Sequence, residues 1–139
     1  MSLRPVLVLL RITVMLQLSL LLAQTALAGG FLGGHYDLLK VHGVVARAIV
    51  GVAVVLVVVA VLVRRAGGPP LFIGPSIAAL LTLVGQFALG MTRVVAPHVL
   101  LGAIMLAVMF HLSIRTFSTP LQAPASASRA RDERVEVAP

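Results

Sequence analysis

Two histidines, His42 and His98, are the side chains of this sequence best placed to do chemistry, because each lies beside or within a long apolar stretch. A neutral imidazole is a common metal ligand. Ionisable residues inside apolar segments are costly, and they mark functional sites by default. The pair therefore suggests a metal or cofactor site, provided that the elements carrying the two side chains bring them together.

The composition excludes several other kinds of chemistry. The 139 residues include no cysteine, so there is no disulfide framework, no thiolate metal site and no cysteine nucleophile. Four acidic residues leave little for catalysis by paired carboxylates. An enzyme is therefore the class of protein that the sequence supports least.

The elements that must position the histidines are apolar helices. The chain is 60% hydrophobic and 11% charged, with a mean hydropathy of +1.11, whereas a soluble domain is about 45–50% apolar and about 25% charged. A helix needs about 20 apolar residues to cross a bilayer. We expect four spans, at about 6–27, 41–63, 71–92 and 96–117. The second is valine-rich, but a segment in lipid must satisfy its own backbone hydrogen bonds and becomes a helix.

The connections between the spans predict an all-α, antiparallel four-helix membrane bundle. The glycine pairs at 29–30 and 33–34 break the first helix, and Asp37 is a candidate N-cap for the second. The Gly-Gly-Pro-Pro sequence at 67–70 predicts a turn. A very short link precedes Pro97, which suits the first turn of the fourth helix.

The basic residues predict the orientation of the bundle. One side of the membrane receives most of the arginines: Arg4, Arg11, Arg64, Arg65, Arg115, Arg129, Arg131 and Arg134. The other receives Lys40, Arg93 and Arg47. The positive-inside rule then places both termini in the cytoplasm. The net charge of +7 thus reflects the orientation of the helices in the membrane. It does not indicate a groove that binds nucleic acid. Ten arginines to one lysine indicate a GC-rich bacterial genome. We expect the protein to lie in the plasma (inner) membrane.

The two ends of the chain have their own signals. Residues 118–139 are rich in Ser, Pro, Ala and Arg, and we expect a disordered cytoplasmic tail after the domain at 1–117. Residues 1–28 have features of a signal peptide, with an Ala-Leu-Ala sequence at 26–28. The charge-free stretch at 12–28 is longer than the usual signal core of about 7–15 residues, which favours an uncleaved anchor. Cleavage is the alternative, and it would leave three spans in the same orientation.

Polar side chains in the spans gather in the outer half of this bundle. His42 and His98 begin helices that run in the same direction, so they lie at similar depth, and Gln24, Arg47 and Gln86 lie near that level. Bundle cores commonly build cofactor sites from side chains on facing helices. Two facing imidazoles at one depth are best explained as the axial ligands of one b-type haem.

Residues near the two histidines suit such a cofactor. Ala46 and Gly102 each follow a histidine by four residues, so they share its helix face and leave room for a flat ring. Ile49 and Met105 each follow by seven residues and could pack against the macrocycle. The same face of each helix thus offers a ligand, a small residue and an apolar contact.

Two arginines and two glutamines complete the predicted cofactor-binding set. Arg47 and Arg93 could pair with the haem propionates, and Gln24 or Gln86 could hold a propionate or a ligand imidazole. Plainer roles remain open for each of them. Both histidines could lie in the headgroup region, Arg47 could extend along the helix to the surface, and the glutamines could simply link helices by hydrogen bonds.

The other histidines are weaker candidates. His111 lies about 140° around the helix from His98 and has no counterpart on the second span, so we expect no second haem. His35 belongs to a loop, where it could join Asp37 and His42 in a surface copper or zinc site.

Short segments around the candidate ligands resemble a known group of proteins. These are His-Gly-Val-Val-Ala-Arg at 42–47 with Gly51, Gln86, and Pro-His-Val-Leu-Leu-Gly-Ala at 97–103. They are similar to small, largely uncharacterised bacterial four-helix membrane proteins that resemble one half of haem A synthase and cytochrome b bundles. The resemblance covers about residues 6–117 and implies haem b held by His42 and His98. The synthase also needs an acidic residue near a histidine within the membrane, which this sequence lacks, so no catalytic role carries over.

These features lead us to expect a haem-bearing electron carrier or subunit. Two protein ligands on one iron favour electron transfer, with a quinone or an extracytoplasmic redox partner. The alternative function is that of a haem-free structural or accessory subunit of a larger membrane complex. For its assembly, the chain could form a homo-oligomer or be a subunit of a membrane complex. A small transporter is less well supported, because no helix has a mid-membrane Gly or Pro break of the kind that builds substrate sites.

Overall fold

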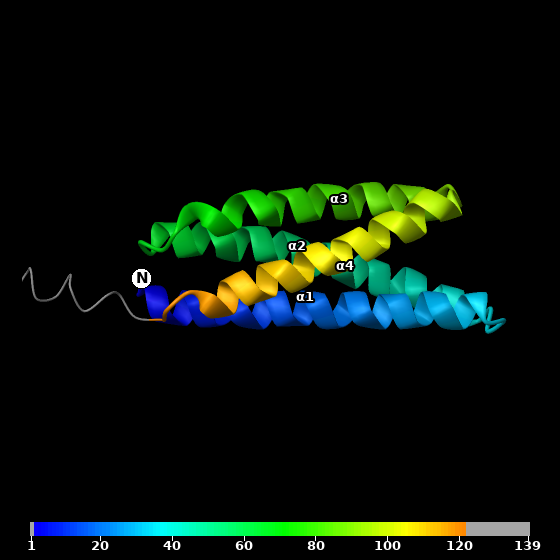
Figure 1. Cartoon of the computed structure of the whole chain (residues 1–139), viewed down its shortest axis with the longest axis horizontal. Helices are drawn as coiled ribbons and strands as arrows, with labels where there is room; N and C mark the ends of the chain where they lie inside the picture. The colour runs from blue at the N-terminus through cyan, green and yellow to red at the C-terminus, as the bar shows by residue number, and fades with distance from the viewer. Residues whose placement is uncertain (1, 122–139) are drawn as a thin grey trace, which may run out of the picture.

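The computed structural model describes residues 2–121, which form four long helices joined by short turns (Figure 1). The elements in chain order are α1 (Leu3–Leu32), α2 (Leu38–Arg65), the short 3-10 helix η1 (Pro70–Phe72), α3 (Ile73–Met91) and α4 (Val95–Ser118). Helices α1, α2 and α4 and the segment Pro70–Met91 are each long and apolar enough to cross a membrane. By length and composition, the chain thus has four helices that could each cross a membrane, as expected of a multi-pass membrane protein.

The four predicted spans are confirmed as helices, including the valine-rich second one. The first helix ends later than predicted, because α1 continues through Gly29 and Gly30 to Leu32. Glycine keeps its backbone N–H and C=O groups, so the helical hydrogen bonds can continue through it. The chain turns only where Gly34 adopts a φ of 101°, a conformation that glycine reaches without steric cost.

The other predicted helix ends agree with the structure in position. Asp37 is the N-cap residue of α2, but its side chain makes no capping hydrogen bond, because its backbone is already helical (φ −60°, ψ −30°). Pro97 is the third residue of α4, within the first turn. The predicted tail at 118–139 lies outside the described residues from position 122 onward.

The three turns between helices share one hydrogen-bond pattern. The first residue after the C-cap donates its backbone N–H to the carbonyl three residues earlier. The second residue after the C-cap donates its backbone N–H to the carbonyl five residues earlier. This is the Schellman motif, whose middle residue takes a positive φ. The middle residues are Gly34 (101°), Gly67 (85°) and Arg93 (57°). An arginine thus occupies a position that glycine fills in the other two turns.

Helices α2 and α4 cross between α1 and α3 (Figure 1). Each of the two crossing helices packs against both α1 and α3. At one end of the bundle the pairs are α1 with α2 and α3 with α4, and at the other end they are α2 with α3 and α1 with α4. We call the first the histidine end, because it holds His42 and His98. The opposite end holds Arg4, Arg64 and Arg65, and we call it the arginine end.

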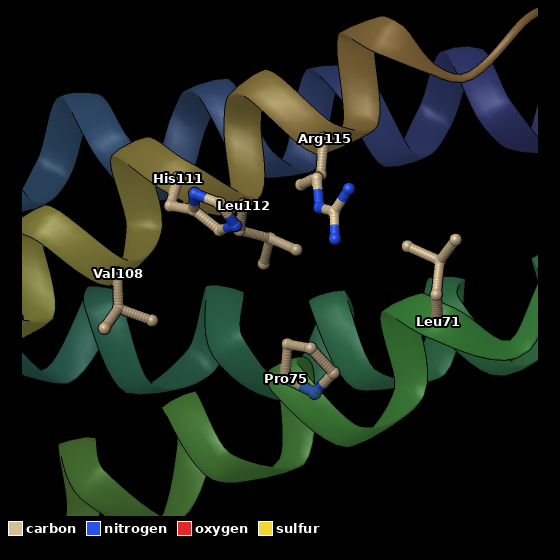
Figure 2. Close-up of a pocket in the computed structure, with 6 residues that line it drawn as sticks. All are labelled: Leu71, Pro75, Val108, His111, Leu112 and Arg115. Carbon is tan, nitrogen blue, oxygen red and sulfur yellow. The ribbon is translucent and has the colours of Figure 1, made fainter.

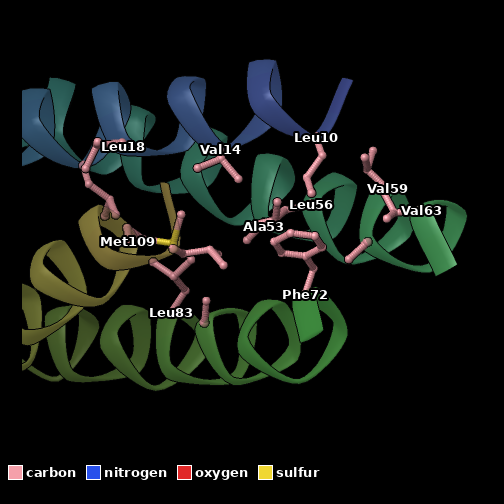
Figure 3. Close-up of a cluster of buried hydrophobic side chains, with 14 of the residues drawn as sticks. Leu10, Val14, Leu18, Ala53, Leu56, Val59, Val63, Phe72, Leu83 and Met109 are labelled. Carbon is pink, nitrogen blue, oxygen red and sulfur yellow. The ribbon is translucent and has the colours of Figure 1, made fainter. Parts of the chain in front are cut away.

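Buried apolar side chains are concentrated toward the arginine end. They lie within residues 6–21, 49–63, 72–83 and 105–112. Figure 3 shows Phe72, which is fully buried, pointing from η1 toward Leu56 of α2 within this cluster. No residue of the segments 22–48 and 84–104 is buried. The bundle is therefore tightly packed in one half and open in the other.

Arg11 ties α1 to the last turn of α4. Its guanidinium donates to the backbone carbonyls of Thr119 (2.8 Å) and Phe117 (3.3 Å) and lies 5.2 Å from the centre of the Phe117 ring. The last carbonyls of a helix lack partners within the helix and carry its negative dipole end. Arg11 satisfies two carbonyls there, so it has a structural role.

Candidate functional site

The candidate site lies just beyond the packed half of the bundle. The residues that mark the edge of the core are Leu21 on α1, Ile49 on α2, Leu83 on α3 and Met105 on α4. Gln24 and Gln86 each follow an edge residue by three positions, and His42 and His98 each precede one by seven. Each helical hairpin therefore contributes one glutamine and one histidine at matching levels.

The structure brings the two histidine rings together. Their centroids are 6.3 Å apart, and the ring planes are inclined by 60°. A metal–imidazole bond of about 2 Å, with about 1 Å from each ring nitrogen to its centroid, places two rings that share one metal about 6 Å apart. Both side chains are half-buried. The distance between the two rings is therefore compatible with a shared metal ion.

The ring of His98 is held in a defined tautomer. Its Nδ1 lies 3.0 Å from the backbone carbonyl oxygen of Gln86. A carbonyl can only accept, so Nδ1 carries the proton and donates it, which leaves the lone pair on Nε2. Within residues 2–121, the Nε2 atom of neither histidine forms a hydrogen bond. A Cβ on Gly90 would lie 3.1 Å from the His98 ring, so the absence of a side chain at Gly90 leaves room for this ring.

The two glutamines bind backbone rather than side chains. The amide of Gln24 donates to the His42 carbonyl (3.1 Å), and the amide of Gln86 donates to the His98 carbonyl (2.7 Å). Each glutamine thereby fixes how far the histidine-bearing helix is shifted along the helix that carries the glutamine. The two hairpins share this arrangement although Gln and His are 18 residues apart in one and 12 in the other. Because the two loops differ in length, the sequence alone does not reveal that the two hairpins repeat this arrangement.

The small residues beside the histidines have different surroundings. A Cβ on Gly102 would lie 2.9 Å from the Gln86 amide nitrogen, so Gly102 provides the space through which that amide reaches the His98 carbonyl. Ala46, at the equivalent position of α2, is half-buried. Ile49 and Met105 are both buried in the core below the site.

The two predicted arginines lie at the border of the site. Arg47 lines a cavity of about 190 Å³ between α2 and α3, with Val50, Val84 and Phe87 as the other lining residues. Arg93 is the strained residue of the α3–α4 turn, five positions before His98. Both side chains are exposed. Neither forms an ion pair or side-chain hydrogen bond with any of the residues 2–121.

The remaining histidines do not form further ligand groups. Within the described part of the chain, no three His, Cys, Asp or Glu side chains come close enough to hold a metal ion. The surface copper or zinc site expected from His35, Asp37 and His42 is therefore not assembled. His111 lies on α4 in a second cavity near the arginine end, where no other histidine lines the wall.

Sequence reasoning identified the histidines but not what supports them. Gly90 and the backbone carbonyl of Gln86 hold the His98 ring, yet a carbonyl has no residue-type signal and a single glycine near a helix end is common. The sequence also carries no signal for three buried polar atoms beside the pair. His42 Nδ1, Gln24 Oε1 and Gln86 Oε1 have no hydrogen-bond partner among the described residues.

Comparison with known proteins finds no match for this chain among protein-family models, curated proteins or solved structures. The assignment of a function therefore depends on the site itself.

Proposed function

We propose that this chain is a bacterial plasma-membrane protein that binds one b-type haem through His42 and His98 and serves in electron transfer. The observation that carries the proposal is the separation of the two rings, 6.3 Å between centroids, on two helices that run in the same direction. The likeness of the histidine segments to one half of haem A synthase points the same way.

The surroundings of the pair fit a large planar group. The proton on His98 Nδ1 leaves Nε2 as the ligand atom, and its hydrogen bond to the Gln86 carbonyl would hold the ring in orientation and increase its basicity. The helices part into two pairs at this end, and no side chain of 22–48 or 84–104 is buried there. The unpartnered atoms beside the rings are polar groups that a cofactor or its water would satisfy.

The chain's own residues would place and tune the cofactor. Arg47 and Arg93 have no ion-pair partner among residues 2–121, and carboxylates such as propionates are natural partners of arginine. Gln24 and Gln86 would keep both ligands at one level through the two histidine carbonyls. A bound haem supplies a reversible one-electron couple at iron. Two protein ligands leave no open position for oxygen or substrate, which favours a carrier over a catalyst.

The orientation follows from the charges. The arginine end would face the cytoplasm with both termini, and the histidine end would face the other side of the membrane. A quinone in the bilayer or a redox protein outside the cytoplasm would then be able to approach the site.

An absorption spectrum tests the proposal directly. We expect the purified protein, expressed with added haem, to show a Soret band and about one haem per chain. H42A and H98A should each lose the six-coordinate spectrum, whereas H111A and H35A, matched histidine removals outside the site, should retain it. Folded protein without a Soret band, or a full spectrum in H98A, would overturn the proposal. In that event a haem-free accessory subunit becomes the better hypothesis.

A further inference from the structure

A second cavity opens between α3 and α4 near the arginine end (Figure 2). Its volume is about 260 Å³, and its lining residues are Leu71, Pro75, Val108, His111, Leu112 and Arg115. The cavity exists because α4 diverges from α3 toward the arginine end, where it packs against α1 instead. Figure 2 shows the Arg115 side chain extending from α4 into the space that faces α3.

The cavity combines an apolar wall with two basic side chains. His111 and Arg115 are four residues apart on α4, so they lie on one helix face about 6 Å apart along its axis. Both side chains are exposed, and the other four lining residues are apolar. Such a site suits an amphiphile with an anionic or oxygen-rich end.

Among residues 2–121, the charged side chains at this end of the bundle are all positive. Arg64 and Arg65 lie at the same end of the bundle, and Arg11 is already engaged with the carbonyls that end α4. Asp37 is the one acidic residue between positions 2 and 121, and it lies at the opposite, histidine end. Within that part of the chain, no carboxylate is available to pair with Arg115.

The depth of the two basic residues indicates which amphiphile fits. Arg115 is three residues from the end of α4, and Leu71 lies in η1 at the start of its span. With the four helices spanning a bilayer, the cavity mouth would lie at the level of the lipid headgroups. His111 is one helical turn deeper, where the glycerol esters of a phospholipid lie. Val108 is a further turn toward the centre of the bilayer, at the level of acyl chains.

We propose that this cavity is a binding site for an anionic phospholipid. Arg115 binds the phosphate, His111 donates a hydrogen bond to an ester carbonyl, and an acyl chain lies along Pro75 and Val108. Basic pockets between membrane helices on the cytoplasmic side are suited to anionic headgroups. A free phosphate would leave the apolar wall unfilled, which is why a lipid is the favoured occupant. The proposal is independent of haem binding.

Lipid titration of the full-length protein in detergent tests this site. We expect phosphatidylglycerol to raise the melting temperature and to remain bound in native mass spectrometry, whereas phosphatidylcholine does so weakly. R115Q should bind phosphatidylglycerol about tenfold more weakly, because it loses a charge-assisted hydrogen bond. V108F should also weaken binding, because the larger side chain fills the apolar part of the cavity without changing the charge.

R64Q is the matched control, since it removes one arginine from the same end but outside the cavity. We expect it to bind phosphatidylglycerol like the wild type, and each variant should retain its helical circular dichroism. Equal losses in R64Q and R115Q would overturn the proposal in favour of a diffuse interfacial charge effect. Millimolar inorganic phosphate that displaces the lipid completely, or unchanged binding in both R115Q and V108F, would also overturn it.

Discussion

Gln17 is the most unusual single residue of the core. Its side chain is fully buried in the middle of α1, and neither its amide nitrogen nor its amide oxygen has a partner among the described residues. The other buried polar side chains all donate to a backbone carbonyl three or four residues earlier in the chain: Thr13, Ser76, Ser113 and Thr116. An unsatisfied amide in an apolar interior costs stability, so Gln17 stands apart.

We expect Gln17→Leu to stabilise the bundle by about 1–3 kcal/mol, because it removes two unpartnered polar groups at nearly constant volume. Thermal unfolding in detergent measures the change. Thr13→Val is the control: it removes a hydroxyl that already has a partner, so a similar gain is not expected. A clear loss of stability in Gln17→Leu would show that the amide has a partner in solution.

Gly102 is the residue on which the Gln86 hydrogen bond depends. We expect Gly102→Ala to destabilise the protein by about 1 kcal/mol, because the new Cβ would meet the amide that reaches the His98 carbonyl. If this explanation is right, Gly102→Ala should cost much less in a Gln86→Ala background, and a double-mutant cycle by thermal unfolding measures the coupling. Additive effects would contradict it.

At the scale of helices and turns, the α3–α4 connection has the most strained backbone of the three turns. Arg93 holds a φ of 57°, which disfavours any residue with a Cβ. Strain of this kind often accompanies function. Here the strained turn immediately precedes the helix that carries His98.

We expect Arg93→Gly to raise stability by about 1 kcal/mol, since glycine adopts this conformation without the steric cost. Arg93→Ala removes the same charge but keeps the Cβ, so it should gain nothing. Thermal melts of both variants separate backbone strain from charge. Equal stabilisation by glycine and alanine would attribute the effect to the guanidinium instead.

At the scale of the whole molecule, the bundle has one rigid half and one open half. At the histidine end the helices pair as α1–α2 and α3–α4, and no residue of the segments 22–48 and 84–104 is buried there. Local stability follows the number of buried apolar contacts. The open half is therefore the part of the protein that a ligand would organise.

Hydrogen exchange in detergent should reveal this asymmetry. In haem-free protein we expect amides of residues 38–48 and 95–104 to exchange sooner than those of 53–63, although all lie in helices. Haem should slow exchange in the first two segments and leave the third unchanged. Uniform exchange along α2 without haem would contradict the inferred difference in packing.

The sequence alone determined the four helices, their order and the common level of the two histidines in the bundle. Length, hydropathy and turn residues are local properties, and lipid leaves a long apolar segment little choice but a helix. His42 and His98 could be placed at one level because both begin helices that run in the same direction.

Only the tertiary structure decided which side chains meet. All four helices are apolar on every side, so their patterns do not reveal an inward face. The crossing of α2 and α4 determines the open histidine end, the pairing of glutamines with histidine carbonyls, the space that Gly102 leaves and the cavity beside Arg115. These features depend on the fit between whole helix surfaces, which involves residues far apart in the chain and therefore has no local signal.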